Sequence, residues 1–204
     1  MFIKICGITN IEDAQLAVNS GASALGFIFA KSKRQLTAET AVEIIKKLPD
    51  SVEKIGVFSN QDKIQLIETA SRCGLTGLQL HGEESQDYLD ELGQNYKILK
   101  SIKVDPEGNI LSGGKYNVWK LLLDTYLPNM SGGTGKTFDW KCLENFDLQQ
   151  IIVAGGLNPD NVASLLSVYT PFGVDVCSGL EAYPGKKDEG KMRKFFREIE
   201  NHKK

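Results

Sequence analysis

The chain has 204 residues, of which 24 are Lys or Arg and 26 are Asp or Glu, so its formal net charge is only −2. This length suffices for one well-buried core. The near-neutral charge gives no electrostatic reason to expect nucleic acid or an anionic membrane as a partner. No run of the sequence approaches the roughly 18 apolar residues of a membrane span, and the first residues lack the pattern of a signal peptide. We therefore expect a cytoplasmic protein that binds any anion through a local site.

Four cysteines stand singly along the chain, at Cys6, Cys73, Cys142 and Cys177. No CxxC pair is present, so the sequence predicts neither a metal site nor a redox motif. Four cysteines would be enough for two disulfides. Because no secretory signal is seen, we expect the reduced thiols of a cytoplasmic protein instead.

Short apolar runs alternate with stretches of helical spacing along the whole chain. The spacing between runs leaves room for a loop, a helix and a return loop, which is typical of βαβ units in a parallel sheet. Eight such units predict an α/β fold, a closed (β/α)₈ barrel. With no linker or repeat in the sequence, we expect residues 1–204 to form one domain. The predicted strands begin near Phe2, Ala24, Glu53, Thr76, Tyr96, Trp119, Gln150 and Phe172.

Capping residues predict where several helices begin and end. Thr37 is expected to cap a helix that stops before Pro49, and Asn158 to cap the helix after the seventh strand. Asn60 is expected to cap a helix that ends at Gly74. The side chains expected to face the core are Ala41, Ile44, Ile45 and Leu48; Ile64, Ile67 and Ala70; Val162, Leu165 and Leu166; and Met192, Phe195, Phe196 and Ile199.

The fifth unit lacks the pattern of a helix. Between Ile102 and Val118 the chain carries Pro106, Gly108 and a pair of glycines, with no apolar stripe at helical spacing. These residues favour turns and loops. We therefore expect the fifth helix to be short or absent.

Polar side chains stand at the carboxyl ends of four predicted strands, opposite their aliphatic neighbours. Side chains alternate across a strand, so Cys6 shares a face with Lys4 while Ile3 and Ile5 take the other face. Active sites of barrel enzymes lie at this end of the strands. Each residue alone could be structural, as a buried thiol or a turn residue, but together they predict one site. The polar residues expected to converge there are Cys6, Gln79, His81, Asp124 and Asp175.

Two glycine-containing loops predict a phosphate site. Gly155 and Gly156 follow the seventh predicted strand, and Ser178 and Gly179 follow the eighth. Glycine lets backbone N–H groups approach an anion, and a helix N-terminus adds the positive end of a dipole. Barrels frequently build their phosphate site from these two loops.

Residues 132–137, Gly-Gly-Thr-Gly-Lys-Thr, end like a nucleotide-binding P-loop. That motif needs a glycine where Met130 stands, and a long loop separates the glycines from the strand end at Asp124. We interpret the segment instead as a glycine-hinged loop that closes over a substrate.

Eight sets of short motifs follow one another nearly from end to end. They are KICGIT at 4–9, GFIF at 26–29, GVF at 56–58, LQLHG at 78–82, LLDT at 122–125, GGTG at 132–135 with FDW at 138–140, AGGLNPDN at 154–161, and VDVCSGLE at 174–181 with PG at 184–185. In this order they resemble the phosphoribosylanthranilate isomerases of tryptophan biosynthesis, a family of barrel enzymes.

The resemblance implies an Amadori rearrangement of N-(5-phosphoribosyl)anthranilate to 1-(2-carboxyphenylamino)-1-deoxy-D-ribulose 5-phosphate, without a cofactor. It also implies that Cys6 is the general base, that Asp124 is the general acid and that Arg34 binds the anthranilate carboxylate. Among the remaining site residues, Gln79, His81 and Asp175 are expected to bind the substrate, and Gly155, Gly156, Ser178 and Gly179 its phosphate. The expected partner is this small phosphorylated aminosugar, and the expected assembly is a monomer or a homodimer.

This chemistry needs two shifted pKa values. The acid must protonate the furanose ring oxygen and the base must remove the proton on C2. A free thiol has a pKa of about 8.5 and a free Asp of about 3.9. We expect Lys4 to lower the pKa of Cys6, and burial to raise that of Asp124.

Two positions depart from the usual pattern of the family. Lys33 stands where a proline usually precedes the binding arginine, which puts the affinity for anthranilate in question. Cys177 stands where the family usually has serine. Because a thiol is a weak donor, we expect one phosphate contact to be lost while the backbone donors remain.

Two other functions remain open from the residues. One is a barrel isomerase for another phosphorylated aminosugar, in which two aspartates are the expected pair, so Cys6 speaks against it. The other is a barrel that only holds a phosphorylated ligand. Such a protein would need neither the acid nor the base.

Overall fold

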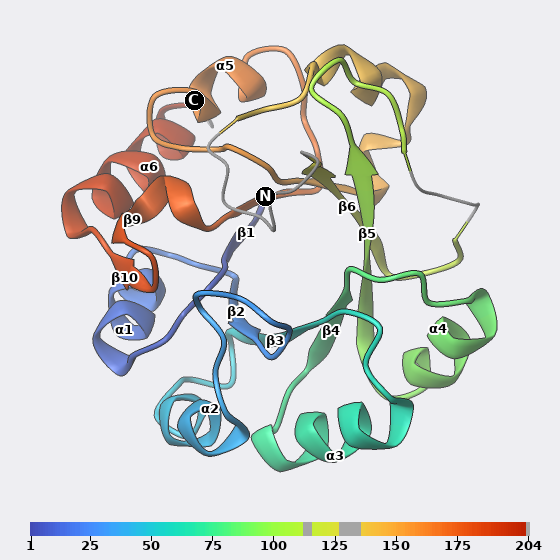
Figure 1. The fold of residues 1–204 in the computed structure, drawn as a ribbon. Coiled ribbons are helices and arrows are strands. Elements are labelled where there is room, and N and C mark those ends of the chain that lie inside the picture. The colour runs from blue at the N-terminus through green and yellow to red at the C-terminus, as the bar shows by residue number, and fades with distance from the viewer. Residues whose placement is uncertain (112–115, 127–135, 203–204) are drawn as a thin grey trace.

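Eight parallel strands pair in chain order and close on themselves, which confirms the predicted α/β barrel (Figure 1). The computed structural model describes residues 1–111, 116–126 and 136–202. Every strand begins at the residue expected from the sequence or one residue after it. The strands are β1 (Phe2–Ile5), β2 (Ala24–Ile28), β3 (Glu53–Phe58), β4 (Gly77–Leu80), β5 (Lys97–Val104), β6 (Lys120–Thr125), β7 (Ile151–Val153) and β8 (Gly173–Val176).

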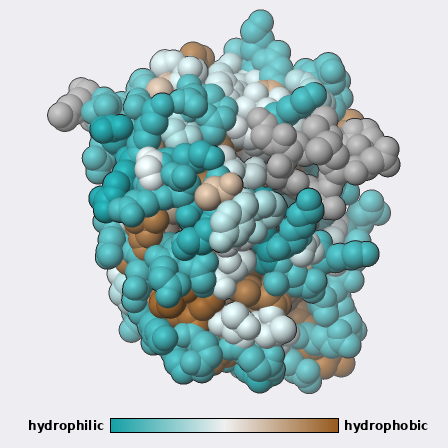
Figure 2. Space-filling view, turned by 60° about the vertical axis from the view of Figure 1, so that its left-hand side comes forward, coloured by the Kyte–Doolittle hydropathy of each residue, from teal (hydrophilic) through white to brown (hydrophobic). Residues whose placement is uncertain are grey.

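Helices surround the barrel on its outside (Figure 1). They are α1 (Ile11–Asn19), α2 (Ala38–Ile45), α3 (Lys63–Cys73), α4 (Gln86–Gly93), α5 (Val162–Leu166) and α6 (Glu189–Asn201). Among the described residues, no helix has the length and apolarity to cross a membrane. The face shown in Figure 2 is largely hydrophilic, with hydrophobic residues in small separate areas.

The fifth and sixth units carry no α-helix in the part of the chain that the structure describes. Residues 105–111 and 116–119 are irregular apart from a turn and one β-bridge, as the sequence predicted for the fifth unit. After β6, two short 3₁₀ helices, η1 (Trp140–Asn145) and η2 (Leu148–Gln150), take the place of a helix. Residues 127–135, which hold most of the glycine-rich loop, lie outside the described residues.

Three of the expected helix ends are confirmed, including the stop of α2 before Pro49, and two are wrong. The Thr37 hydroxyl accepts from the Thr40 amide, and Gly74 ends α3 with a left-handed φ of 63°. The N-cap of α3 is Asp62, whose carboxylate accepts from the amides of two residues in the first turn. Asn60 does not cap α3; its side-chain oxygen accepts instead from the Glu83 amide, in the loop after β4.

The expected cap at Asn158 is also wrong. Helix α5 begins three residues later than predicted and has Asn161 at its N-cap. The side chain of Asn158 instead accepts from the Asp160 amide and donates to the Gly156 carbonyl. Asn158 therefore fixes the glycine turn that precedes the helix.

The expected apolar stripe of α3 is largely wrong. Ile64 and Ile67 are 67% and 41% exposed. The buried residues are Leu66, Ala70 and Cys73. They lie at the i, i+4 and i+7 spacing of one helical face, and this face packs toward α2. The stripe predicted for α6 is confirmed, because its four apolar residues are all buried.

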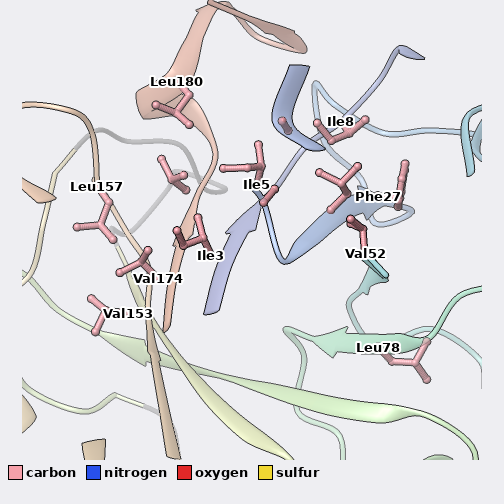
Figure 3. Close-up of a cluster of buried hydrophobic side chains, with 14 of the residues drawn as sticks. Ile3, Ile5, Ile8, Phe27, Val52, Leu78, Val153, Leu157, Val174 and Leu180 are labelled. Carbon is pink, nitrogen blue, oxygen red and sulfur yellow. The ribbon is translucent and has the colours of Figure 1, made fainter. Parts of the chain in front are cut away.

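Two apolar layers fill the fold. The larger one lies between the barrel and the helices and includes Ile3, Ile5 and Val174 (Figure 3). The smaller one fills the barrel interior with Ala24, Ile55, Leu99, Leu122, Ile152 and Ala154. Phe2, Trp119 and Phe172 pack below it, with ring centroids 5.5 to 5.7 Å apart. These three rings close the amino-terminal end of the barrel, so the polar groups collect at the other end.

Candidate active site

A cavity of about 350 Å³ lies at the carboxyl ends of the strands. The side chains expected from strand alternation reach it from different strands, and the loop residues join them. Its lining includes Cys6, Arg34, Gln79, His81, Asp124, Asp175, Gly155, Gly156 and Ser178. Among the predicted site residues, Gly179 alone is not part of this lining.

Lys4 and Asp175 form a buried ion pair in the barrel interior, and Asp175 also lines the cavity. The Lys4 side chain is 0% exposed, and its Nζ donates to Asp175 Oδ1 at 2.9 Å. The pairing of β1 with β8 places the two residues side by side. Lys4 also hydrogen-bonds the Cys6 thiol. A charge at this depth is stable only with such partners.

Gly26 makes room for Lys4 and Cys6. A Cβ at Gly26 would lie 2.7 Å from Cys6 Sγ and 3.1 Å from Lys4 Nζ. Both distances are too short for an undisturbed contact. Glycine at this point of β2 therefore lets the thiol and the ammonium group meet.

The pKa of the Cys6 thiol lies below its ordinary value. The strongest cause is a hydrogen bond with the Cys177 thiol; burial opposes it, and the Lys4 charge adds to the lowering. The same hydrogen bond, with burial, raises the pKa of Cys177. The expected influence of Lys4 is therefore present, and Cys177 is a partner that the sequence did not indicate.

Asp124 has the opposite shift. Burial raises the pKa of its carboxyl group to about 7, and the nearby Asp175 carboxylate adds to this effect while Lys4 opposes it. A substantial share of Asp124 therefore keeps its proton near neutral pH, as an acid requires.

His81 and Gln79 form a pair on the cavity wall. Burial, with the Lys4 and Lys100 charges, lowers the pKa of His81 to about 4, so its imidazole is neutral near pH 7. The Gln79 amide nitrogen contacts His81 Nε2. Gln79 Oε1 is buried and has no hydrogen-bond partner among the described residues. A buried oxygen without a partner costs free energy unless a ligand or a water molecule donates a hydrogen bond to it.

Arg34 is held in place by Glu181, the first residue of a short hairpin. Arg34 Nε and Nη2 donate to the two carboxylate oxygens at 2.7 and 2.6 Å. Glu181 belongs to β9 (Glu181–Tyr183), which pairs with β10 (Lys186–Lys187). The Lys187 ammonium group also contacts this carboxylate, at 3.4 Å. The pair occupies the edge of the guanidinium that carries Nε and Nη2.

The two phosphate-site loops use their glycines in different ways. Gly155 and Gly156 have φ of 76° and 67°, where a side chain is strained. Added Cβ atoms would also overlap Thr125 and the Lys136 carbonyl. A Cβ at Gly179 would lie 1.9 Å from the Leu157 oxygen. Gly179 therefore lets the two loops approach each other and does not face the cavity.

Several cavity residues were missed in the sequence. Ser101 and Lys103 line the cavity from β5, and Thr125 lines it from the end of β6. Ser101 Oγ and Thr125 Oγ1 are buried without a hydrogen-bond partner in the described structure. Strand alternation could have identified the first two, because Ser101 and Lys103 follow the inward Leu99 at steps of two. No local pattern marks Glu181 as the partner of Arg34.

The sequence model of the family "N-(5'phosphoribosyl)anthranilate (PRA) isomerase" matches residues 3–198. The chain belongs to this family. A PRA isomerase from Pelobacter propionicus is 44% identical over 197 residues, which cover 96% of this chain and 93% of the relative. The motif resemblance is thus confirmed, and the chain is an isomerase of tryptophan biosynthesis.

Solved structures of PRA isomerases share the fold. The crystal structure of the Thermotoga maritima enzyme matches with a TM-score of 0.85 at 38% identity, over 98% of this chain and 99% of that one. A PRA isomerase crystallised in complex with reduced 1-(o-carboxyphenylamino)-1-deoxyribulose 5-phosphate matches with a TM-score of 0.82 at 34% identity, with the same coverage. Family membership favours this activity over the two alternatives left open by the residues.

Proposed function

We propose that Cys6 and Asp124 are the base and the acid with which this chain, acting as one domain of residues 1–204, converts N-(5'-phosphoribosyl)anthranilate to 1-(2-carboxyphenylamino)-1-deoxy-D-ribulose 5-phosphate. One observation carries the proposal. A thiol with a lowered pKa and a carboxyl group with a pKa raised to about 7 line the same cavity. An acid–base pair that works near neutral pH needs shifts in these directions.

The proposed reaction uses each group once in the forward direction. Asp124 gives its proton to the furanose ring oxygen as the bond from C1 to that oxygen breaks, and the nitrogen lone pair forms a C=N bond to C1. The Cys6 thiolate then takes the proton on C2, and the released electron pair forms an enolamine. Tautomerisation of the enolamine gives the ketone. No electrons enter or leave, so the reaction requires no redox cofactor.

The rest of the cavity holds the two ends of the substrate in this proposal. The backbone of Gly155 and Gly156 and the Ser178 region bind the phosphate, with Gly179 keeping the two loops together. Arg34 binds the anthranilate carboxylate through the part of its guanidinium that Glu181 does not use.

The middle of the substrate faces polar groups on the strands. Gln79, His81 and Asp175 contact the ribose hydroxyl groups, and the unpartnered Gln79 Oε1 is the clearest support for this role. The Cys177 thiol is turned to Cys6, so it is not assigned to the phosphate.

The compartment and the oligomeric state of the enzyme are also part of the proposal. All four cysteines are free thiols, which supports the reducing environment of a cytoplasm. A T. maritima relative is described as a dimeric enzyme from which monomers were generated. We propose a homodimer or a monomer for this chain, which light scattering at defined protein concentrations will distinguish.

The fluorescence of the anthranilate group gives a direct test. Wild-type enzyme should convert the substrate with a steady change in fluorescence. Cys6→Ala and Asp124→Asn should each lower kcat about 100-fold or more. Cys73→Ser, remote from the cavity, is the matched control and should leave kcat unchanged. Near-normal rates in either site variant would remove that residue's role, and stable binding without conversion by the wild type would remove the activity.

A further inference from the structure

Cys6 and Cys177 are neighbours across the seam where the barrel closes. Strands β1 and β8 pair with Lys4 beside Asp175 and Ile5 beside Val176. The ladder continues one step further, because the Cys6 amide donates to the Val176 carbonyl at 2.9 Å. The next pair in this register is Cys6 and Cys177, and their thiols hydrogen-bond to each other.

This placement suits a disulfide without rearrangement of the barrel. Adjacent strands lie roughly 4.8 Å apart, and the Cα atoms of disulfide-bonded cysteines lie about 4.4–6.8 Å apart. Both residues line the cavity. Their side chains therefore lie next to each other on the same side of the sheet.

The two remaining cysteines lack these properties. Cys73 is buried between α3 and α2, where its thiol contacts the Ala38 carbonyl. Burial raises its pKa, and burial with the Asp139 charge raises that of Cys142 to about 11. Only a thiolate attacks an oxidant efficiently. Lys4 beside Cys6 favours the thiolate there, and the cavity admits small molecules to it.

We propose that Cys6 and Cys177 form a site of reversible oxidation, at which hydrogen peroxide converts the two thiols to a disulfide and stops catalysis. The Cys6 thiolate attacks one peroxide oxygen, the O–O bond breaks, and Cys6 becomes a sulfenic acid, while the leaving hydroxide takes up the proton that the thiol had lost and forms water. Cys177 sulfur then attacks Cys6 sulfur, the S–O bond breaks, and a second water leaves. Two thiols are oxidised and one peroxide is reduced. A dithiol reverses the change by thiol–disulfide exchange.

The disulfide itself depends only on the geometry of the two thiols. The loss of activity additionally rests on the proposed role of Cys6 as the base, so two readouts are needed. Peptide mapping reports the bond, and the fluorescence assay reports catalysis.

Mapping needs one supporting substitution. Trypsin cleaves after Lys4, Lys31, Lys141 and Lys186, so Cys142 and Cys177 fall on one peptide, residues 142–186. A link to the Cys6 peptide, residues 5–31, would be ambiguous in the wild type. The folded Cys142→Ser enzyme resolves this. After peroxide treatment and blocking of free thiols, we expect the two peptides to be joined, with a mass two hydrogen atoms below their sum.

Cys177→Ser tests the partner. In this variant no joined peptide should form, and prolonged peroxide should carry Cys6 on to sulfinic acid, so that dithiothreitol no longer restores activity relative to the untreated variant. Cys73→Ser should behave as the wild type, with most activity lost and then regained. Equal sulfinic acid at Cys6 in Cys142→Ser and in Cys177→Ser, with no joined peptide, would overturn the proposal. A joined peptide with undiminished activity would instead overturn the role of Cys6 as the base.

Discussion

Glu181 accepts two parallel hydrogen bonds of 2.7 and 2.6 Å from Arg34, which lies 147 residues earlier in the chain. Such bidentate pairs fix the orientation of a guanidinium as well as its place. The guanidinium of Arg34 is therefore held in one orientation at the cavity wall. A carboxylate that never touches the substrate in the proposed mechanism thus positions the group that does.

The Glu181→Gln variant should separate binding from catalysis. It loses one charged acceptor, and a hydrogen bond to a charged group contributes about 1.5–3 kcal/mol. We expect KM to rise about tenfold or more while kcat changes little, measured by steady-state fluorescence. Glu189→Gln, which breaks an exposed pair with Arg193, should leave KM unchanged. An unaltered KM in a Glu181→Gln enzyme that is folded would contradict the positioning role.

The Gly26→Ala variant should impair catalysis through the Cys6 thiol. The new methyl group would meet Cys6 Sγ at 2.7 Å, so the thiol or Lys4 must move. Displacements of this kind near reacting atoms cost up to about 100-fold in rate, and we expect kcat to fall at least about tenfold. In Gly93→Ala the nearest atom would be Ile98 Cγ1 at 3.8 Å, an ordinary contact, so kcat should stay unchanged. Equal rates in the two variants would show that the space at Gly26 is unimportant.

The rate should depend on pH through Asp124. Its pKa is raised to about 7, so the acid loses its proton as the pH rises through that value. We expect kcat/KM to decline above about pH 7 and also on the acidic side, as the Cys6 thiolate takes up a proton. Profiles measured between pH 5 and pH 9, in buffers of constant ionic strength, check this. A profile that stays level from pH 7 to pH 9 would deny Asp124 the role of the acid.

The same pKa shift predicts a cost in stability. The folded protein prefers a neutral Asp124, whereas the unfolded chain ionises this group near its usual pKa. Its contribution to stability is therefore fully present at low pH and is lost as the pH rises toward about 7. Asp124→Asn cannot ionise, so its Tm should exceed that of the wild type by several degrees at pH 8, and by much less at pH 4. A Tm difference independent of pH would show that Asp124 is not held neutral by the fold.

Local patterns were enough to predict the strands and most of the site. Alternation in β1 and β4 set Cys6, Gln79 and His81 on the inward face, because the aliphatic residues beside them could only pack outward. The barrel then brought these strand ends together. This step needed only the count and order of the units.

The features that the sequence did not predict depend on competing local signals or on contacts between residues far apart in the chain. Asn60 and Asp62 are both good caps, and α3 has apolar residues on two faces, so only the packing against α2 decides that Leu66 is buried and Ile64 is exposed. The contact of Cys6 with Cys177 requires the register of β1 against β8. No pattern within a short window of sequence contains that register.

The pairing of β1 with β8 also constrains the order in which the protein folds. Lys4 meets its counter-ion 171 positions later, at Asp175. During synthesis, the Lys4 ammonium group on the first strand therefore has no Asp175 carboxylate to pair with until the last strand has been made. Contacts between such distant segments form late and slow folding. A nascent chain cut short before β8 would carry Cys6, Asp124 and Arg34, and would still lack Asp175 and the loop after β8.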